Sequence, residues 1–202
     1  MPLKEALKCF SCFEVSGLCS RVLSELRRVF GVDVTELLSP YSELLLCSGL
    51  FTEVYLVSSD LLGVVDVLRR SGRVPYCVGI YVGRFRGRKP YLIPSTMLAN
   101  TVFSRLGRYV STVVVSDEGL KPFLYGRDVL KASVTKVYPK LRRKDIAFVV
   151  GIDGYVYGVG ISLVDDSTIN DLGRNDVVVK NVFDVGWYLR GGTEPREKKF
   201  KT

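Results

Sequence analysis

The stretch 147–164, AFVVGIDGYVYGVGISLV, constrains the fold of this chain more than any other. Two alternating apolar runs flank Asp153-Gly154, and an Asp-Gly pair in that position is the strongest short-range signal for a β-hairpin. Gly158 and Gly160 lie inside the second run, where glycine indicates a bulge or the close approach of another backbone. The stretch therefore predicts a glycine-punctuated hairpin in a small, curved sheet.

A second segment, 121–136 (KPFLYGRDVLKASVTK), precedes the hairpin and carries positive charge. It predicts a helical turn over 119–125 that ends at Gly126, because glycine readily adopts a positive φ and lets the backbone reverse. A basic extended segment, 127–136, follows. Helical turn, glycine, basic strand and hairpin together predict a small β-barrel with a cationic shoulder. This order resembles the PUA domain, an RNA-binding module.

The rest of the chain predicts an α/β N-terminal domain, and we expect the boundary near residue 110. The expected domains are an N-terminal α/β domain over 1–110, a PUA domain over 111–190 and a basic tail over 191–202. The first forty residues are expected to be helical. Strands are expected at 43–47, 53–57, 76–84, 91–93, 112–115, 134–138, 146–152, 155–164, 176–180 and 185–190, with helices ending near Gly31, Gly72 and Gly107. The fold class is thus α+β, a small mainly antiparallel sheet with flanking helices followed by a β-barrel.

Composition places the chain among globular cytoplasmic proteins. Hydrophobic residues make up 47% of its 202 residues, which is ample for a core. Its longest apolar run is far below the roughly 20 residues that a bilayer requires, and Glu5 and Lys8 interrupt the stretch where a signal peptide would be apolar. We therefore expect no membrane association and a reducing compartment.

The five cysteines, Cys9, Cys12, Cys19, Cys47 and Cys77, are expected to be small buried hydrophobes. An odd number argues against a disulfide framework in a reducing compartment. Cys9 and Cys12 have the spacing of a zinc or redox pair, but the chain has no histidine and no second short-spaced pair. No metal and no cofactor are expected.

The net charge of +8 is unevenly distributed. Residues 67–116 contain nine arginines and lysines and no acidic residue, a second basic cluster spans 136–144, and a third lies in 190–201. Solvated helix faces explain single runs of charge. Fifty residues without an anion instead favour an anion-binding surface, and nucleic acid is the partner that such a surface suggests.

Catalytic motifs are absent from the sequence. Gly158-Val159-Gly160 lacks the third glycine and the helix of a dinucleotide site. The run 165–168, Asp-Asp-Ser-Thr, has the composition of a turn or helix cap rather than of an acid/base pair. Without a histidine or a nucleophile paired with a base, we expect no enzyme activity.

From residue 54 onward the chain resembles the Nip-seven family, PUA proteins that act in assembly of the large ribosomal subunit. The segments that carry the resemblance are 54–58 (VYLVS), 82–85 (VGRF), 123–131 (FLYGRDVLK) and 158–160 (GVG). The third of these is the most specific, because generic PUA domains do not carry it in that form. The first forty residues match the family poorly, and so does the tail.

The resemblance implies an archaeal-type, non-catalytic factor in ribosomal RNA processing and subunit assembly that binds single-stranded, uridine-rich RNA. It also implies protein partners in the exosome or in ribosome assembly. The alternative is an RNA-modifying enzyme, or its substrate-delivery subunit, in which the PUA domain anchors the RNA. Phe85, Tyr91, Tyr138 and Tyr155 are candidate stacking residues. The candidate RNA-binding residues are Arg84, Arg86, Arg88, Lys89, Lys121, Arg127, Lys131, Lys136, Lys140, Arg142, Arg143, Lys180 and Arg190.

Overall fold

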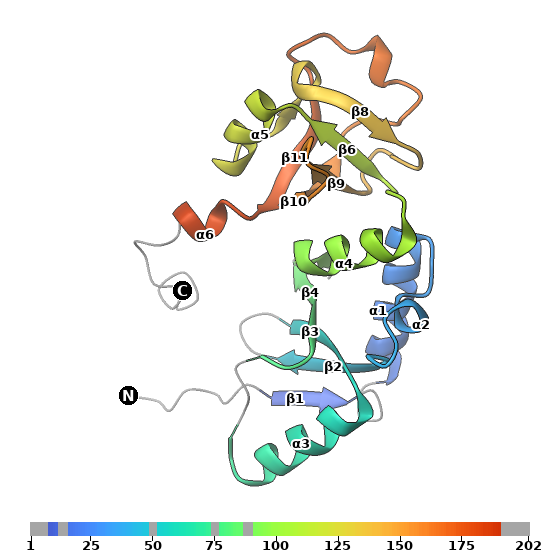
Figure 1. The fold of residues 1–202 in the computed structure, drawn as a ribbon, viewed down its shortest axis with the longest axis vertical. Coiled ribbons are helices and arrows are strands. Elements are labelled where there is room, and N and C mark those ends of the chain that lie inside the picture. The colour runs from blue at the N-terminus through green and yellow to red at the C-terminus, as the bar shows by residue number, and fades with distance from the viewer. Residues whose placement is uncertain (1–7, 12–15, 49–51, 74–76, 87–90, 191–202) are drawn as a thin grey trace. The chain divides into compact units, whose positions relative to one another are not determined.

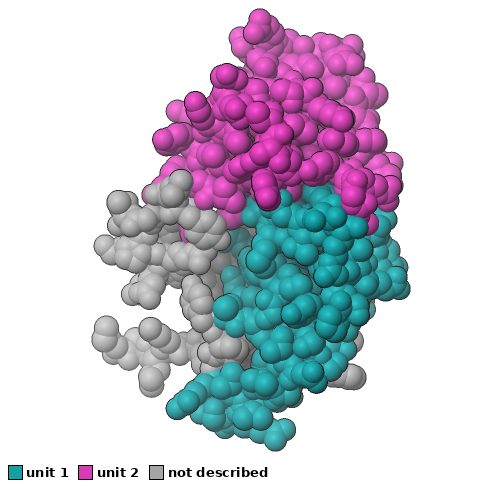
Figure 2. Space-filling view, viewed as in Figure 1, with its two compact units in different colours: residues 1–105 teal, residues 106–202 magenta. Residues whose placement is uncertain are grey.

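The computed structural model describes residues 8–11, 16–48, 52–73, 77–86 and 91–190. The chain divides into two compact units, residues 1–105 and 106–202, which Figure 2 shows in teal and magenta. Each unit has its own sheet, and no strand pairing within the described ranges joins the two.

The first unit is a five-stranded antiparallel sheet with helices (Figure 1). The strand order is β1-β2-β3-β4-β5, so each strand pairs with its neighbour in sequence. The strands are β1 (Lys8–Ser11), β2 (Glu43–Ser48), β3 (Thr52–Val57), β4 (Ile80–Arg86) and β5 (Tyr91–Pro94). The helices are α1 (Ser16–Phe30), α2 (Val34–Leu37), α3 (Ser59–Arg70) and α4 (Thr96–Leu106).

The apolar run in β2 is continuous because both faces of this sheet are covered. Leu45 and Cys47 on one face pack with Val57 of β3 and Val65 of α3. Leu44 and Leu46 point the other way, because side chains alternate along a strand, and they are buried as well. The helices α1 and α4 meet through the edge-to-face rings of Phe30 and Phe103, 5.8 Å apart.

Two expectations for the first unit were wrong. The first forty residues are not all helical, since 8–11 form β1 and pair with β2. Cys19 and Cys47 are buried as expected, but both are disulfide-bonded, whereas Cys77 is an exposed free thiol. An odd number of cysteines excludes only that all of them are paired, and the sequence spacing does not show which thiols the fold brings together.

The second unit is a curled six-stranded sheet with the order β7-β11-β10-β9-β6-β8. Its pairings are antiparallel except that of β6 with β9. The strands are β6 (Thr112–Val115), β7 (Val129–Leu130), β8 (Val134–Tyr138), β9 (Ile146–Val150), β10 (Val156–Ser162) and β11 (Val177–Asp184). The helices are α5 (Asp117–Leu124) and α6 (Trp187–Arg190), and two 3-10 turns are η1 (Lys131–Ser133) and η2 (Ile169–Asp171).

The connection between β7 and β8 explains why this sheet curls. These strands lie at the two ends of the strand order, yet only the three residues of η1 separate them in the chain. The sheet must therefore bend until its two ends meet at η1. The fold class expected from the sequence, α+β with a helix-flanked antiparallel sheet followed by a barrel-like sheet, is confirmed.

The glycines of β10 permit close packing, as their positions in the sequence indicated. A Cβ atom on Gly158 would lie 2.5 Å from the Phe123 ring and equally close to the carbonyl oxygen of Phe183. The register of β10 shifts beside each glycine, between Val156 and Gly158 and between Val159 and Gly160. Both the bulge and the close approach are confirmed.

The strand expected at 185–190 was wrong. β11 ends at Asp184, and 187–190 form the short helix α6, with the Arg190 amide donating to the Gly186 carbonyl. Gly186 lies against the carbonyl of Leu124, and the chain turns there because this contact leaves no room for a side chain. No helix in the described ranges is long and apolar enough to cross a membrane.

Candidate nucleic-acid interface

The helix α5 positions the basic segment that follows it. The Ser116 hydroxyl caps α5 by accepting from the Gly119 amide at 3.2 Å, and this satisfies one of the free amides of the first turn. The helix ends at Leu124, and Gly126 follows with a φ of 84°, in the left-handed region. The Arg127 amide then donates back to the Pro122 carbonyl at 3.1 Å. The chain reversal predicted at Gly126 is confirmed, and we call residues 125–128 the elbow.

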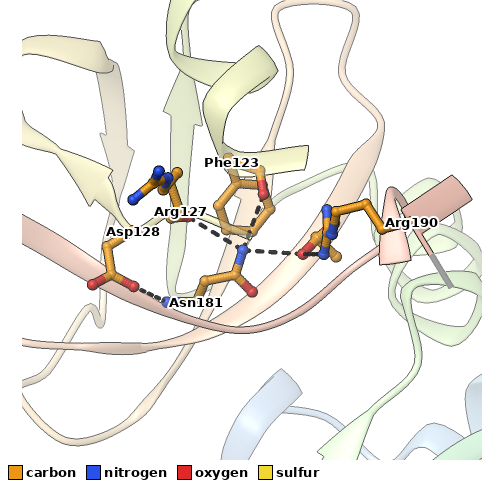
Figure 3. Close-up of polar contacts among 6 residues, drawn as sticks. Phe123, Arg127, Asp128, Asn181 and Arg190 are labelled. Atoms are coloured by element: carbon orange, nitrogen blue, oxygen red, sulfur yellow. Dashed lines mark hydrogen bonds and ion pairs between the residues drawn. The ribbon is translucent and has the colours of Figure 1, made fainter. Parts of the chain in front are cut away.

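The side chain of Asn181 on β11 holds this elbow in place (Figure 3). Its amide group donates to the carbonyl oxygens of Phe123 at 3.0 Å and of Arg127 at 3.3 Å. The backbone amide of Asn181 donates to the Asp128 carboxylate at 2.8 Å. One residue of the strand therefore fixes both the end of α5 and the start of the basic segment.

Arg190 closes the same network from α6. Its Nη1 and Nη2 donate to the two carboxylate oxygens of Asp184 at 2.9 and 2.8 Å. Asp184 is 2% exposed and also accepts from Asn181 at 3.1 Å. The Arg190 guanidinium lies against Gly126, where a Cβ would be 3.3 Å from Nη2. Arg190 was a candidate phosphate ligand, and its bidentate ion pair also gives it a structural role.

A groove of about 390 Å³ lies beside β8 in the second unit. Because the two ends of the sheet meet at η1, we call it the seam groove. Its lining includes Ile169 of η2, which is 5% exposed and belongs to the core of the unit. The lining residues are Lys131, Val134, Thr135, Lys136, Val137, Tyr138, Pro139, Asp166, Ile169 and Asn170.

The groove combines two ammonium groups with an aromatic wall. Lys131 and Lys136 both line it, and Lys136 Nζ lies 4.5 Å from the centroid of the Tyr138 ring. The ring of Tyr109 packs 5.0 Å from that of Tyr138, and its hydroxyl donates to the Gly154 carbonyl at 2.6 Å. Burial raises the pKa of Tyr109, and Tyr138 and Asp153 raise it further. Tyr138 is therefore a fixed wall rather than an open stacking face.

A short loop between β8 and β9 presents further cations beside this groove. We call residues 140–144, Lys-Leu-Arg-Arg-Lys, the basic loop. Leu141 is fully buried and anchors it. Asp166 accepts from the Lys140 amide at 3.1 Å, and Asp165 accepts from the Arg143 amide at 3.0 Å. The four charged side chains remain exposed.

The basic loop has unusual backbone geometry. Lys140 and Lys144 have φ values of 71° and 72°, a region in which side chains other than glycine, asparagine and aspartate are uncommon. The Lys144 amide donates to the Ser162 carbonyl at 2.8 Å, so hydrogen bonds to the 162–166 segment stabilise both lysines. The acidic run 165–168 thus serves as a turn, as its composition indicated.

The structure brings together only part of the predicted set of basic residues. Lys131 and Lys136 line the seam groove, and Lys140, Arg142 and Arg143 lie in the adjoining basic loop. Arg127 and Lys180 are exposed near the Asn181 network, and Lys121 is exposed on α5. The expected continuous strand 127–136 is interrupted by η1, because the Lys131 and Ala132 amides bond to the carbonyls of Asp176 and Arg174.

The remaining candidates belong to the first unit. Arg84 lies on β4, where it pairs with Glu53 and Ile93 in the sheet register. Arg86 ends that strand. Arg88, Lys89 and the side chain of Arg86 lie outside the described residues. The structure therefore describes this basic hairpin only at its base.

Among the candidate stacking residues, Phe85 is buried at 6% exposure and cannot offer a face to a base. Tyr155 is 63% exposed and Tyr91 37%. Tyr125 at the elbow was not selected, yet it is 75% exposed. Asn181, Asp184 and Asn170 were missed as well. Tyr125 directly precedes the predicted turn glycine, Gly126, and this position is the sequence signal that could have identified it as exposed.

No group of three metal-ligating side chains occurs in the part of the chain that the structure describes. What the second unit offers is a cationic groove, a basic loop and exposed aromatic residues. These groups can bind a polyanion.

Comparison with known proteins identifies a PUA domain in the second unit. The model of the UPF0113 PUA domain matches residues 111–193. A UPF0113 protein from Aeropyrum pernix is 31% identical over 159 residues, which are 76% of this chain and 79% of the relative. The 60S ribosome subunit biogenesis protein NIP7 of Saccharomyces cerevisiae is 28% identical over 113 residues, 56% of this chain and 60% of that protein.

The fold also matches a solved structure. A conserved PUA domain protein from Thermoplasma acidophilum superimposes with a TM-score of 0.57 at 16% identity, and the match covers 90% of this chain and 95% of that one. The predicted resemblance to the Nip-seven family of PUA proteins is confirmed. On the strength of these matches, the chain belongs to the UPF0113 family.

Proposed function

We propose that this protein is a non-catalytic RNA-binding factor in ribosomal RNA processing and assembly of the large ribosomal subunit. It binds single-stranded RNA, including uridine-rich stretches, through its PUA domain, residues 111–190. The observation that carries the proposal is that Lys131 and Lys136 line one groove next to the basic loop. The yeast relative's name as a ribosome biogenesis protein supports the cellular role.

Phosphate neutralisation is the physical basis of this binding. Each lysine or arginine that contacts a phosphate releases a counterion, so that affinity falls with salt. Lys121, Arg127 and Lys180 extend the cationic surface toward the elbow. The hairpin residues Arg84, Arg86, Arg88 and Lys89 form a second basic surface in the proposal. Arg190 is left out of the RNA-binding set because Asp184 occupies its guanidinium.

The test is equilibrium binding of a fluorescent single-stranded RNA at several salt concentrations. With about four to six phosphates contacted, the logarithm of affinity should fall with the logarithm of salt at a slope of about −3 to −4. Replacing Lys131 and Lys136 by Ala should weaken binding of all sequences and flatten the slope by about 1.4. A slope near zero in the unmodified protein would refute the proposal.

A matched control separates the groove from overall charge. Replacing Arg70 and Arg73, which are exposed in the first unit and outside the proposed RNA-binding set, changes the net charge equally. If both double variants lose the same affinity, the groove has no special role. If only the control variant loses affinity, the interface includes the first unit instead of the groove.

The proposal also includes protein partners and the absence of catalysis. The protein works in the cytoplasm with exosome or ribosome-assembly proteins, and such partners should remain bound in pull-downs from RNase-treated extract. The alternative, an RNA-modifying enzyme or its delivery subunit, predicts cleaved or modified RNA after incubation with the pure protein. Mass spectrometry of a defined RNA oligonucleotide distinguishes the two, and unmodified RNA supports the non-catalytic role.

A further inference from the structure

The seam groove has the lining that a planar ring requires as well as the charge that a phosphate requires. Its lining includes apolar residues: Ile169 is 5% exposed, and Val134 and Val137 are partly buried against the core of the unit. Lys131, Lys136, Asp166 and Asn170 also line it. An apolar lining with a few polar groups is characteristic of small-molecule sites. A basic patch that only attracts phosphates needs no apolar lining.

Asp166 is the residue that a site for phosphates alone does not explain. A carboxylate next to Lys131 and Lys136 repels a phosphate, so it weakens the binding that the lysines provide. One of its oxygens, Oδ2, accepts from the Lys140 amide and thereby shapes the basic loop. The described residues provide no hydrogen-bond donor to its other oxygen, Oδ1.

The neighbouring carboxylate shows that shaping the loop does not require a place in the groove. Asp165 accepts from the Arg143 amide at 3.0 Å, the same kind of bond in the same loop. Asp165 does not line the seam groove, whereas Asp166 does. Lining the groove is therefore an additional feature of Asp166, and its Oδ1 is available as an acceptor.

A nucleobase is the ligand that uses a carboxylate in a cationic groove. Phosphate oxygens only accept hydrogen bonds. The donors that RNA offers to a carboxylate are the ribose 2′-hydroxyl and the N–H groups that every nucleobase carries on its pairing edge. Asn170 adds a carboxamide with two donors and an acceptor, which complements the carbonyl or ring nitrogen beside that N–H. In a duplex these edges are already paired, so the base must come from a single strand.

We propose that the seam groove seats one unpaired nucleotide of the RNA, with Asp166 and Asn170 bound to the edge of its base and Lys131 and Lys136 bound to the flanking phosphates. This inference rests on the proposed function and assigns to the same groove a reading of the base in addition to binding of the backbone. Asp166 lowers the affinity for phosphates and in return makes the affinity depend on the base.

The experiment compares single-stranded 8-mers of adenosine, cytidine or uridine with an 8-mer of the same backbone that carries abasic residues. The unmodified protein should bind its preferred base at least about ten-fold more tightly than the abasic strand, a difference typical of one good contact to a base edge. Asp166→Asn should reduce this ratio to within about two-fold. Its affinity for the abasic strand should stay equal or rise, because a negative charge next to the phosphates is gone.

Asp165→Asn is the matched control. It removes the same charge from the same segment and keeps an oxygen acceptor for the Arg143 amide, and it should leave the ratio between base and abasic strands unchanged. Thermal melting of both variants checks that the loop is still folded. Asn170→Ala should lower the ratio in the same direction as Asp166→Asn, without the rise in affinity for the abasic strand.

Different results overturn the two proposals. If Asp166→Asn raises the affinity for all strands equally and keeps the ratio, Asp166 acts only through its charge, and the base-reading inference fails while RNA binding stands. If the unmodified protein binds the abasic strand as tightly as the others, the inference fails in the same way. If no strand binds, the proposed function fails as well.

Discussion

Two lysines of the basic loop should destabilise the fold while they add positive charge, and glycine substitution tests this directly. Lys140 and Lys144 have φ values of 71° and 72°, and the left-handed region costs an L-residue roughly 1–2 kcal/mol. Glycine removes this cost, but its greater conformational freedom in the unfolded chain lowers the stability of the fold by about 0.5–1 kcal/mol. The net stabilisation is about 0.5–1 kcal/mol per site. Both backbone amides keep their acceptors, Asp166 and the Ser162 carbonyl.

The double variant Lys140→Gly with Lys144→Gly should therefore raise the free energy of unfolding by about 1–2 kcal/mol. Each kcal/mol corresponds to about 2–4 °C in melting temperature for a chain of this size. Urea denaturation and differential scanning calorimetry measure the change. The affinity for single-stranded RNA should fall in the same variant, because two cations next to the seam groove are gone.

The same loop provides the control. Arg142 and Arg143 are exposed and are not among the described residues with positive φ. Replacing both by glycine removes the same charge, yet it should destabilise the fold by about 0.5–1 kcal/mol per site. Opposite signs in the two double variants support the reasoning. Equal destabilisation would show that backbone strain in the loop is negligible and would refute it.

Three further outcomes follow from individual contacts in the structure. Gly158→Ala should lower the free energy of unfolding by roughly 1–3 kcal/mol in urea denaturation, because its Cβ would meet the Phe123 ring at 2.5 Å; a loss below about 0.5 kcal/mol would contradict this packing. Arg190→Met should lower the free energy of unfolding by about 3 kcal/mol. This loss should exceed that of Asp184→Asn, because Arg190→Met leaves the Asp184 carboxylate, whose side chain is 3% exposed, without its ion-pair partner. The reverse order would argue against a structural role for Arg190. The hydrogen bond from the Thr35 side chain, followed by that from Arg27, lowers the pKa of Asp33 from 3.8 to about 2, so the stability it contributes is complete above about pH 4 and lost toward pH 2. Thermal melting of Asp33→Asn should show a weaker dependence on pH in this range, and an unchanged dependence would exclude Asp33 as its source.

Local patterns in the sequence predict those elements whose structure depends on neighbouring residues. The hairpin around Asp153-Gly154 and the chain reversal at Gly126 both follow from turn chemistry. The segment 185–190 alternates like a strand, but it turns into α6 because Gly186 lies against the Leu124 carbonyl and Arg190 pairs with Asp184. Contacts between distant segments override a short local pattern.

The candidate site is less accessible to sequence analysis for the same reason. The charge cluster indicates which residues are basic, but not that Lys131 and Lys136 share a groove while Arg190 is engaged by Asp184. Asp166 has the composition of a turn residue and performs that role. Its place in the groove depends on η2 lying next to β8, which no periodicity in either segment reveals.

The open side of β8 has a consequence for solution behaviour. β8 is the last strand in the order of its sheet, so the described structure leaves one edge of it without a strand partner. Such an edge can pair with the edge of a second molecule, and a lysine on it is a common protection against this association. Lys136 lies on this strand, in the seam groove. The charge proposed to attract RNA would thus also keep two copies apart, and a lysine-free groove should self-associate as protein concentration rises, unless RNA covers the edge.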